Sequence, residues 1–107
     1  MEKLMVYHGR RMQMILKDDI LYAQKARYGL DLKTPEGILA HDVKMDRFID
    51  SNNDNFLRCH DSFAVNKKHI SVVEGSSIFL TNGEEIPVSR AYKKAVSEYI
   101  KYLRKMT

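Results

Sequence analysis

The chain has 107 residues, of which 44% are hydrophobic and 30% charged, and its formal net charge is +4. This length and composition exclude fibrous and largely disordered proteins and fit one globular domain, residues 1-107. No apolar run is long enough to cross a bilayer, no secretion signal is recognisable, and a lone cysteine excludes an internal disulfide. We therefore expect a cytoplasmic domain without membrane contact, and the basic balance favours a polyanionic partner such as nucleic acid.

Short apolar-rich runs separated by turn residues fill the first 41 positions. Gly9 and Arg10 form the short break expected of a hairpin, and Pro35 and Gly37 are the residues of a tight turn. The pattern predicts five strands: Lys3–His8, Arg11–Leu16, Ile20–Lys25, Gly29–Thr34 and Gly37–His41.

The apolar spacing then changes to that of a short amphipathic helix, with apolar side chains at Met45, Phe48 and Ile49. Asp42 is the expected N-cap of this helix. The helix should end near Ser51, because the Ser, Asn and Asp side chains of residues 51-55 bond their own backbone and favour a loop.

A second group of short runs follows, and Asn82-Gly83 supplies a strong hairpin signal. These runs predict strands at Phe56–His60, Ser62–Asn66, Ile70–Glu74, Ser77–Thr81 and Glu84–Val88. From Ser89, a possible cap, apolar residues repeat at helical spacing: Tyr92, Ala95, Val96, Tyr99, Ile100 and Leu103. The expected fold is therefore mainly β, with one short internal helix and a C-terminal helix.

The histidines and the cysteine do not form a recognisable metal or catalytic pattern. No C-x-x-C or H-x-x-x-H pair is present, and Cys59 and His60 are neighbours on a strand, so they point to opposite faces. We expect Cys59 to pack inward. No nucleophile, base and oxyanion donor can be named together, and there is no glycine-rich phosphate loop. The sequence therefore predicts no metal, no cofactor and no enzymatic activity.

Basic residues gather at predicted connections, where side chains can reach a ligand. Arg27 stands beside Tyr28 on a tight turn, Lys67 and Lys68 form a second cluster, and Arg90 begins the terminal helix. A solvated surface with no ligand explains such charges equally well from the pattern alone.

Residues 56-70, FLRCHDSFAVNKKHI, resemble the signature of the LytTR family, F-x-R-x-H-x-S-[FY]-x-V-N followed by I. The upstream strand ILYAQ and the closing segment GEEIPVSR agree in order, so the resemblance covers nearly the whole chain. It implies an elongated stack of short antiparallel β-sheets. It also implies sequence-specific DNA binding for transcriptional regulation, with loops that read direct-repeat promoter sites in successive major grooves and a dimer on DNA.

Carried over by position, the base-reading loops of the family fall at residues 25-28, 60-62 and 89-90. The implied base-reading residues are Arg90, Arg27, Tyr28, Asp61 and His60. The implied phosphate-binding residues are Lys25, Lys67, Lys68, Ser62, Ser89 and Lys93. A guanidinium such as that of Arg90 can bond guanine O6 and N7 together.

For three residues of the motif, the sequence allows a role other than direct contact with DNA. Asp61 departs from the amide or basic residue found here in the family, and its carboxylate could accept from cytosine N4 or orient a nearby arginine. Arg58 and Asn66 are expected to bond loop backbone rather than DNA. LytTR domains follow a receiver or sensor domain, so the resemblance implies one in a longer parent. A protein-interaction module without DNA contact is the alternative function, and RNA binding ranks third.

Overall fold

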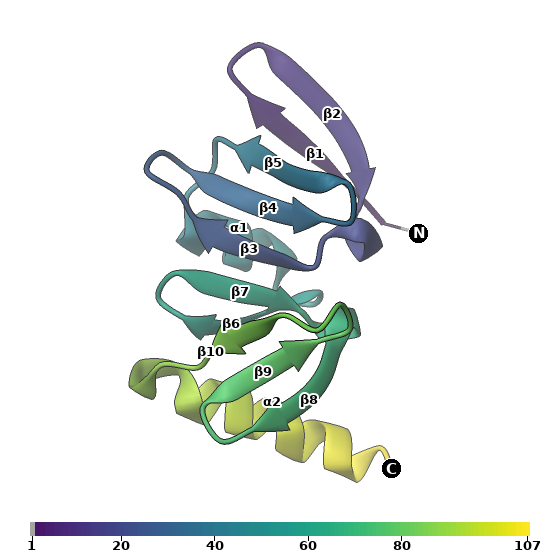
Figure 1. Cartoon of the computed structure of the whole chain (residues 1–107), viewed down its shortest axis with the longest axis vertical. Coiled ribbons are helices and arrows are strands. Elements are labelled where there is room, and N and C mark those ends of the chain that lie inside the picture. The colour runs from purple at the N-terminus through teal and green to yellow at the C-terminus, as the bar shows by residue number, and fades with distance from the viewer. Residues whose placement is uncertain (1) are drawn as a thin grey trace.

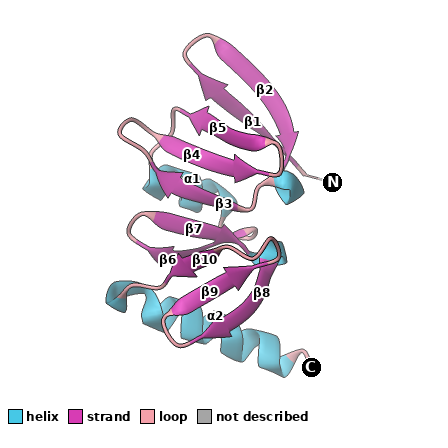
Figure 2. Ribbon diagram, viewed as in Figure 1, coloured by secondary structure: helices cyan, strands magenta, loops and turns pink. Residues whose placement is uncertain are grey.

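The computed structural model describes residues 2-107 and has an elongated shape of 43 × 28 × 25 Å (Figure 1). Within these residues, ten strands form three antiparallel sheets, and two helices pack against them (Figure 2). The strands are β1 (Lys3–His8), β2 (Arg11–Leu16), β3 (Tyr22–Lys25), β4 (Leu30–Thr34), β5 (Gly37–His41), β6 (Phe56–His60), β7 (Phe63–Asn66), β8 (Ile70–Glu74), β9 (Ser77–Leu80) and β10 (Glu85–Pro87). The helices are α1 (Met45–Asn52) and α2 (Lys93–Lys105), with 3-10 turns η1 (Lys17–Asp19), η2 (Lys67–His69) and η3 (Arg90–Tyr92). The predicted mainly β fold is confirmed.

The central sheet has the strand order β5-β4-β3-β7-β6, between the β1-β2 hairpin and the three-stranded sheet β10-β9-β8. Its strand β7 separates two hydrophobic cores, because neighbouring side chains on a strand point to opposite faces. Ala64 packs with Phe48 of α1 in the first core, and Val65 packs with Val96 of α2 in the second. The central sheet therefore holds both helices and both ends of the molecule together.

Cys59 lies in the second core and is fully buried, as expected from the sequence. Burial raises the pKa of its thiol to about 12, because the charged thiolate is poorly solvated there. In the part of the chain that the structure describes, no helix is long and apolar enough to cross a membrane.

Asp42 does not cap α1, and that prediction is wrong. The helix begins at Met45 without a side-chain cap, while the Asp42 carboxylate accepts from the Gly9 amide at 2.8 Å and pairs with His8 at 2.9 Å. The bond from Gly9 lowers the pKa of Asp42 below its usual value. The Asp42 carboxylate therefore bonds residues of the β1-β2 hairpin instead of the amides at the start of α1.

Other predicted boundaries differ for similar reasons. The strand expected at 20-25 begins at Tyr22. Residues 17-19 form the turn η1, and the Ile20 amide donates to the Lys17 carbonyl at 3.0 Å, which closes that turn. Helix α1 continues to Asn52, whose side chain donates to the carbonyl of Phe48 and so stays within the helix. Ser89 makes no side-chain cap, and α2 begins only at Lys93, after η3.

The β1-β2 hairpin docks on the central sheet through His41. The Tyr7 amide donates to Nδ1 of this buried imidazole at 3.2 Å, and the two rings meet edge to face. An Nδ1 that accepts a hydrogen bond belongs to the neutral ring, and burial lowers the pKa of His41 from 6.5. Protonation of His41 therefore opposes docking of the hairpin.

We expect the free energy of unfolding to fall as the pH drops below about 6.5, the pKa of an unfolded histidine. Just below pH 6.5 the unfolded chain binds a proton at His41, whereas the folded protein does not. The contribution of His41 to stability is therefore fully present above pH 6.5 and is lost as the pH falls towards the lower pKa of the folded state. Urea unfolding between pH 5 and 8 measures the slope. The variant His41→Phe should flatten it, whereas an unchanged slope would assign the acid sensitivity to other groups.

Candidate nucleic-acid interface

Three connections lie along one edge of the molecule, at the left of Figure 1, and together we call them the turn edge. They are the β3-β4 turn at residues 26-29, the β6-β7 turn at residues 61-62 and the η3 corner at residues 89-92. Two backbone hydrogen bonds join them: the Lys25 amide donates to the Ser62 carbonyl at 2.9 Å, and the Ser89 amide donates to the Cys59 carbonyl at 3.0 Å. The spacing of the three turns is thus set by main-chain contacts.

Gly29 determines the shape of the first turn. Its φ is +74°, and a Cβ atom at this position would lie 2.3 Å from the carbonyl oxygen of His41. Only glycine adopts this conformation at low cost and tolerates such a close approach. The two preceding residues are held at the tip, where Tyr28 is 79% exposed and the Arg27 guanidinium lies 5.6 Å from the centre of its ring.

His60 is half-buried at the start of the second turn. Its Nδ1 accepts from the Ser62 amide at 3.0 Å, and its ring packs edge-on against Phe63. Because Nδ1 is the acceptor, the neutral ring carries its hydrogen on Nε2. His60 therefore shapes the turn and keeps one donor that can bond an acceptor outside the chain.

Arg58 lies behind the turn edge and connects its second and third parts. The guanidinium donates to the carbonyls of His60 at 3.3 Å and Asp61 at 2.7 Å, pairs with Asp46 on α1, and stacks 5.2 Å from the ring centre of Tyr92 in η3. A planar group with five donors suits this arrangement better than an ammonium would. The interpretation of Arg58 as a backbone-bonding residue agrees with these contacts.

Asp61 has two cationic partners in the structure. Its carboxylate accepts from Nζ of Lys25 at 3.1 Å and from Nη2 of Arg58 at 3.4 Å. The bond from Lys25 is the main reason that the pKa of Asp61 lies below its usual value. Of the two roles considered from the sequence, the contact with a nearby arginine is present, and the contact with cytosine stays a prediction.

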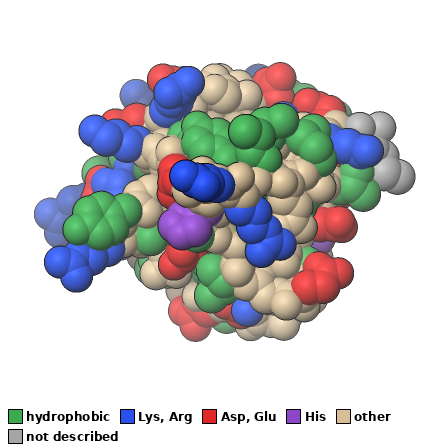
Figure 3. All heavy atoms as spheres, turned by 90° about the horizontal axis from the view of Figure 1, so that it is seen from above, with side chains coloured by type: hydrophobic (Ala, Val, Ile, Leu, Met, Phe, Trp, Pro, Cys, Tyr) green, Lys and Arg blue, Asp and Glu red, His purple; other side chains and the backbone are tan. Residues whose placement is uncertain are grey.

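Arg90 projects from the η3 corner and is exposed. Within residues 2-107 its guanidinium makes no hydrogen bond or ion pair. Lys93 follows in the first turn of α2 and is also exposed. Figure 3 shows basic side chains gathered at the left, the side on which the turn edge lies in Figure 1. This edge therefore combines free donors with positive charge.

A family model described as the LytTr DNA-binding domain matches residues 10-101. The chain belongs to this family. Its relatives include the transcriptional regulatory protein BtsR of Salmonella typhi and that of Salmonella typhimurium, each 28% identical over 95 residues. The match covers 84% of this chain but only 39% of each relative, so the chain spans about two fifths of their length.

A solved LytTr DNA-binding domain from Bacillus cereus has the same fold. The two structures superpose with a TM-score of 0.74 at 24% sequence identity, over 94% of this chain and 95% of the other. The match to the family model and the similarity of the fold are therefore consistent with each other.

The structure brings most of the expected contact residues to the turn edge of this LytTr domain, but not Lys67 and Lys68. Both lie in η2, at the opposite end of β7 from residues 61-62 (Figure 1). The Lys67 ammonium donates to the Asn53 carbonyl at 2.9 Å and lies 5.0 Å from the ring centre of Tyr99, while Lys68 pairs with Asp18 at 3.0 Å. Their expected contact with phosphate stays a prediction, and it requires DNA away from the turn edge.

Two residues at the LytTr turn edge were missed from the sequence. Lys44 is exposed directly before α1 and lines a hollow of about 270 Å³ together with Lys25 and Arg27. In the sequence, Lys44 is recognisable only as a lysine beside a predicted helix start. Nothing there indicates that it lies next to the β3-β4 turn. For Tyr92 the sequence predicts only an apolar helix position, because its stacking on Arg58 depends on tertiary contact.

For Asp61→Asn we expect tighter binding to every duplex alike. The change removes a negative charge from the turn edge and frees Lys25 to approach phosphate, which steepens the dependence on salt by about one counterion. Equilibrium binding to a panel of single-base variants measures this. Relaxed preference at one base pair only would instead show that Asp61 accepts from cytosine.

Proposed function

We propose that this domain regulates transcription by reading a direct-repeat promoter site through the turn edge, as the output domain of a response regulator. The observation that supports this most strongly is the placement of Arg27, His60 and Arg90 on three turns of one edge, each with donors free to meet DNA. Family membership supports DNA as the partner, since the matched model is a DNA-binding domain.

Each turn has its own part in the proposed contact. Arg90 bonds guanine O6 and N7 with two parallel hydrogen bonds, and Arg27 with Tyr28 reaches the neighbouring groove. His60 donates from Nε2 to a base acceptor. Asp61 holds Arg58 and Lys25 beside these groups, so that its charge is balanced where the phosphates approach.

The shape of the domain agrees with contact to successive major grooves. The turns are spread along the longest dimension of 43 Å, and one helical turn of DNA measures about 34 Å. Lys25, Lys93 and Lys44 flank the turns as phosphate ligands, with the hydroxyls of Ser62 and Ser89 beside the backbone. Two copies bound to a direct repeat face the same way along the DNA, in the head-to-tail arrangement that a repeated site requires.

The relatives suggest the wider setting. BtsR is a transcriptional regulatory protein more than twice as long as the matched region, so a longer parent with a receiver or sensor domain fits the same role for this domain. In such a parent the input segment controls how often two copies meet on one promoter.

Selection of bound duplexes from random DNA is the direct test. A selected site with two copies of one motif about one helical turn apart supports the proposal. On that site the affinity should fall roughly 100-fold between 50 and 200 mM salt, if about four phosphates are contacted. No enrichment, together with a salt-independent affinity, would contradict DNA reading and favour a protein-interaction module.

A further inference from the structure

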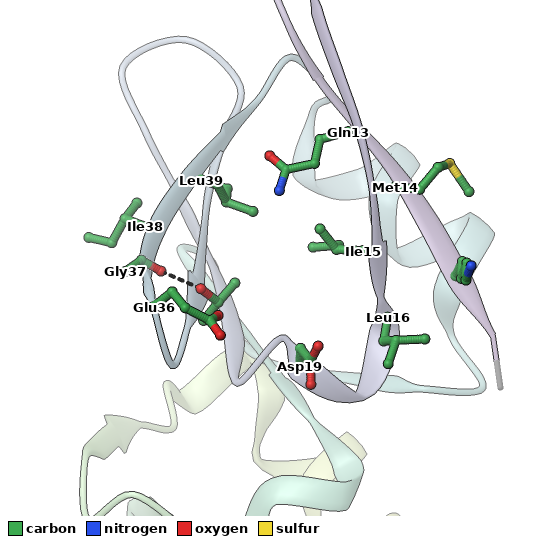
Figure 4. A pocket seen from close by; sticks show the side chains of 11 residues that line it. Gln13, Met14, Ile15, Leu16, Asp19, Glu36, Gly37, Ile38 and Leu39 are labelled. Atoms are coloured by element: carbon green, nitrogen blue, oxygen red, sulfur yellow. Dashed lines mark hydrogen bonds between the residues drawn. The ribbon is translucent and has the colours of Figure 1, made fainter.

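A groove of about 570 Å³ lies between the β1-β2 hairpin and the β5 side of the central sheet (Figure 4). It opens beside Gly37 and Asp19, at the end of the sheet opposite the β3-β4 turn. In Figure 4, Ile15 and Leu39 point into it from facing walls. None of the proposed DNA contacts lines this groove, so DNA binding leaves its purpose unexplained.

The two walls of the groove come from strands of different sheets. Residues 13-16 line one wall and residues 36-39 the other. Figure 4 shows Gln13 and Ile15 of β2 directed towards the groove and Met14 directed away, as the alternation of side chains along a strand requires. Among residues 2-107, strand β2 pairs only with β1, and β5 pairs only with β4, so each has one unpaired edge. Unpaired edges offer free amide and carbonyl groups to another extended chain.

The lining is mixed: Ile15 and Leu39 share the interior with Gln13, and the carboxylates of Asp19 and Glu36 are part of it. Ile38 and Met14 at the rim are 62% and 53% exposed, which is unusual for large apolar side chains on unblocked edges. Asp19 and Glu36 form no ion pair or hydrogen bond in the part of the chain that the structure describes. The lining contains these two carboxylates and one ammonium group, that of Lys3, so its formal charge is negative.

We propose that this groove binds an extended peptide of a separate polypeptide by β-strand addition. Four consecutive residues line the groove on each side, and four residues of a strand span about 13 Å, so the groove suits a four-residue extended peptide. The peptide bonds the free edges through its main chain and places alternate apolar side chains against Ile15 and Leu39. A basic residue at its end meets Asp19 and Glu36. The domain would thus bind DNA on one edge and a protein partner on another.

The test is an NMR titration of the full chain with the capped peptide Lys-Val-Thr-Val-Thr-Val. We expect amide shifts and slowed hydrogen exchange at residues 13-16 and 37-39, with little change in the turn edge. Two control peptides separate the causes: Glu-Val-Thr-Val-Thr-Val reverses the charge, and Lys-Val-Pro-Val-Thr-Val removes a main-chain donor. Each should bind at least about tenfold more weakly than the first peptide.

The matched variants are Ile38→Lys and Val72→Lys. Both positions are exposed in strands, but only Ile38 lies at the groove, so only its variant should weaken peptide binding by about tenfold or more. Absence of shifts at the groove would overturn the proposal, as would equal binding of the proline peptide. Protection of the same amides without peptide, together with dimers in sedimentation, would assign the groove to a second copy and also overturn it.

Discussion

Arg90→Ala should abolish most of the preference for the selected site while leaving affinity for scrambled DNA nearly unchanged. A bidentate arginine-guanine contact contributes about 1 to 3 kcal/mol of discrimination, which corresponds to roughly a five- to 150-fold loss. The exposed guanidinium has no partner within residues 2-107, so its removal leaves the η3 corner intact. Competition binding with cognate and scrambled duplexes measures the ratio directly.

Two lysine variants serve as matched controls for Arg90→Ala. Lys93→Ala, one helical turn away, should weaken binding to all duplexes alike and reduce the salt slope by about one contact. With DNA confined to the turn edge, Lys67→Ala changes neither affinity nor preference, because η2 lies at the far end of β7; with the phosphate contact predicted from the sequence, it weakens binding to all duplexes alike. Equal losses on cognate and scrambled DNA for Arg90→Ala would refute its role as a base reader. A loss for Lys67→Ala would show that the DNA reaches η2.

Asn66→Ala should be the most destabilising of the single changes considered. Asn66 is only 2% exposed. Its side-chain amide donates to the carbonyls of Lys17 at 3.0 Å and Ile20 at 2.8 Å. It also accepts from the Lys68 amide at 3.0 Å. Truncation leaves these backbone groups without their partner, at a cost of about 3 kcal/mol in the free energy of unfolding. Thermal unfolding should shift down by roughly 15 °C.

Asn53→Ala is the control for Asn66→Ala, because its side chain is exposed and makes no hydrogen bond among the described residues. Its unfolding free energy should change by less than about 0.5 kcal/mol. At a temperature where Asn66→Ala is still folded, its affinity for cognate DNA should match that of the unchanged protein. A specific loss of base preference in the folded variant would instead place Asn66 at the DNA.

Much of this protein was determined by local sequence. Alternation of apolar residues and the turn residues between them correctly predicted the strands Lys3–His8, Arg11–Leu16, Gly37–His41, Phe56–His60 and Ile70–Glu74. The motif in residues 56-70 identified the family, and the inward position of Cys59 followed from its place in that strand. These features depend on neighbours in the chain, so periodicity and turn chemistry are sufficient to predict them.

Tertiary structure alone decided the partners of the polar side chains. Asp42 bonds Gly9, 33 positions away, instead of the helix beside it, and Asp61 bonds Lys25, 36 positions away. The separation of Lys67 from the turn edge follows from the length of β7, which no charge cluster in the sequence reveals. The groove between β2 and β5 likewise exists because two strands that are distant in the sequence lie on opposite sides of it. Such contacts depend on how the sheets stack, and a charged or amide side chain takes whichever partner that stacking brings within reach.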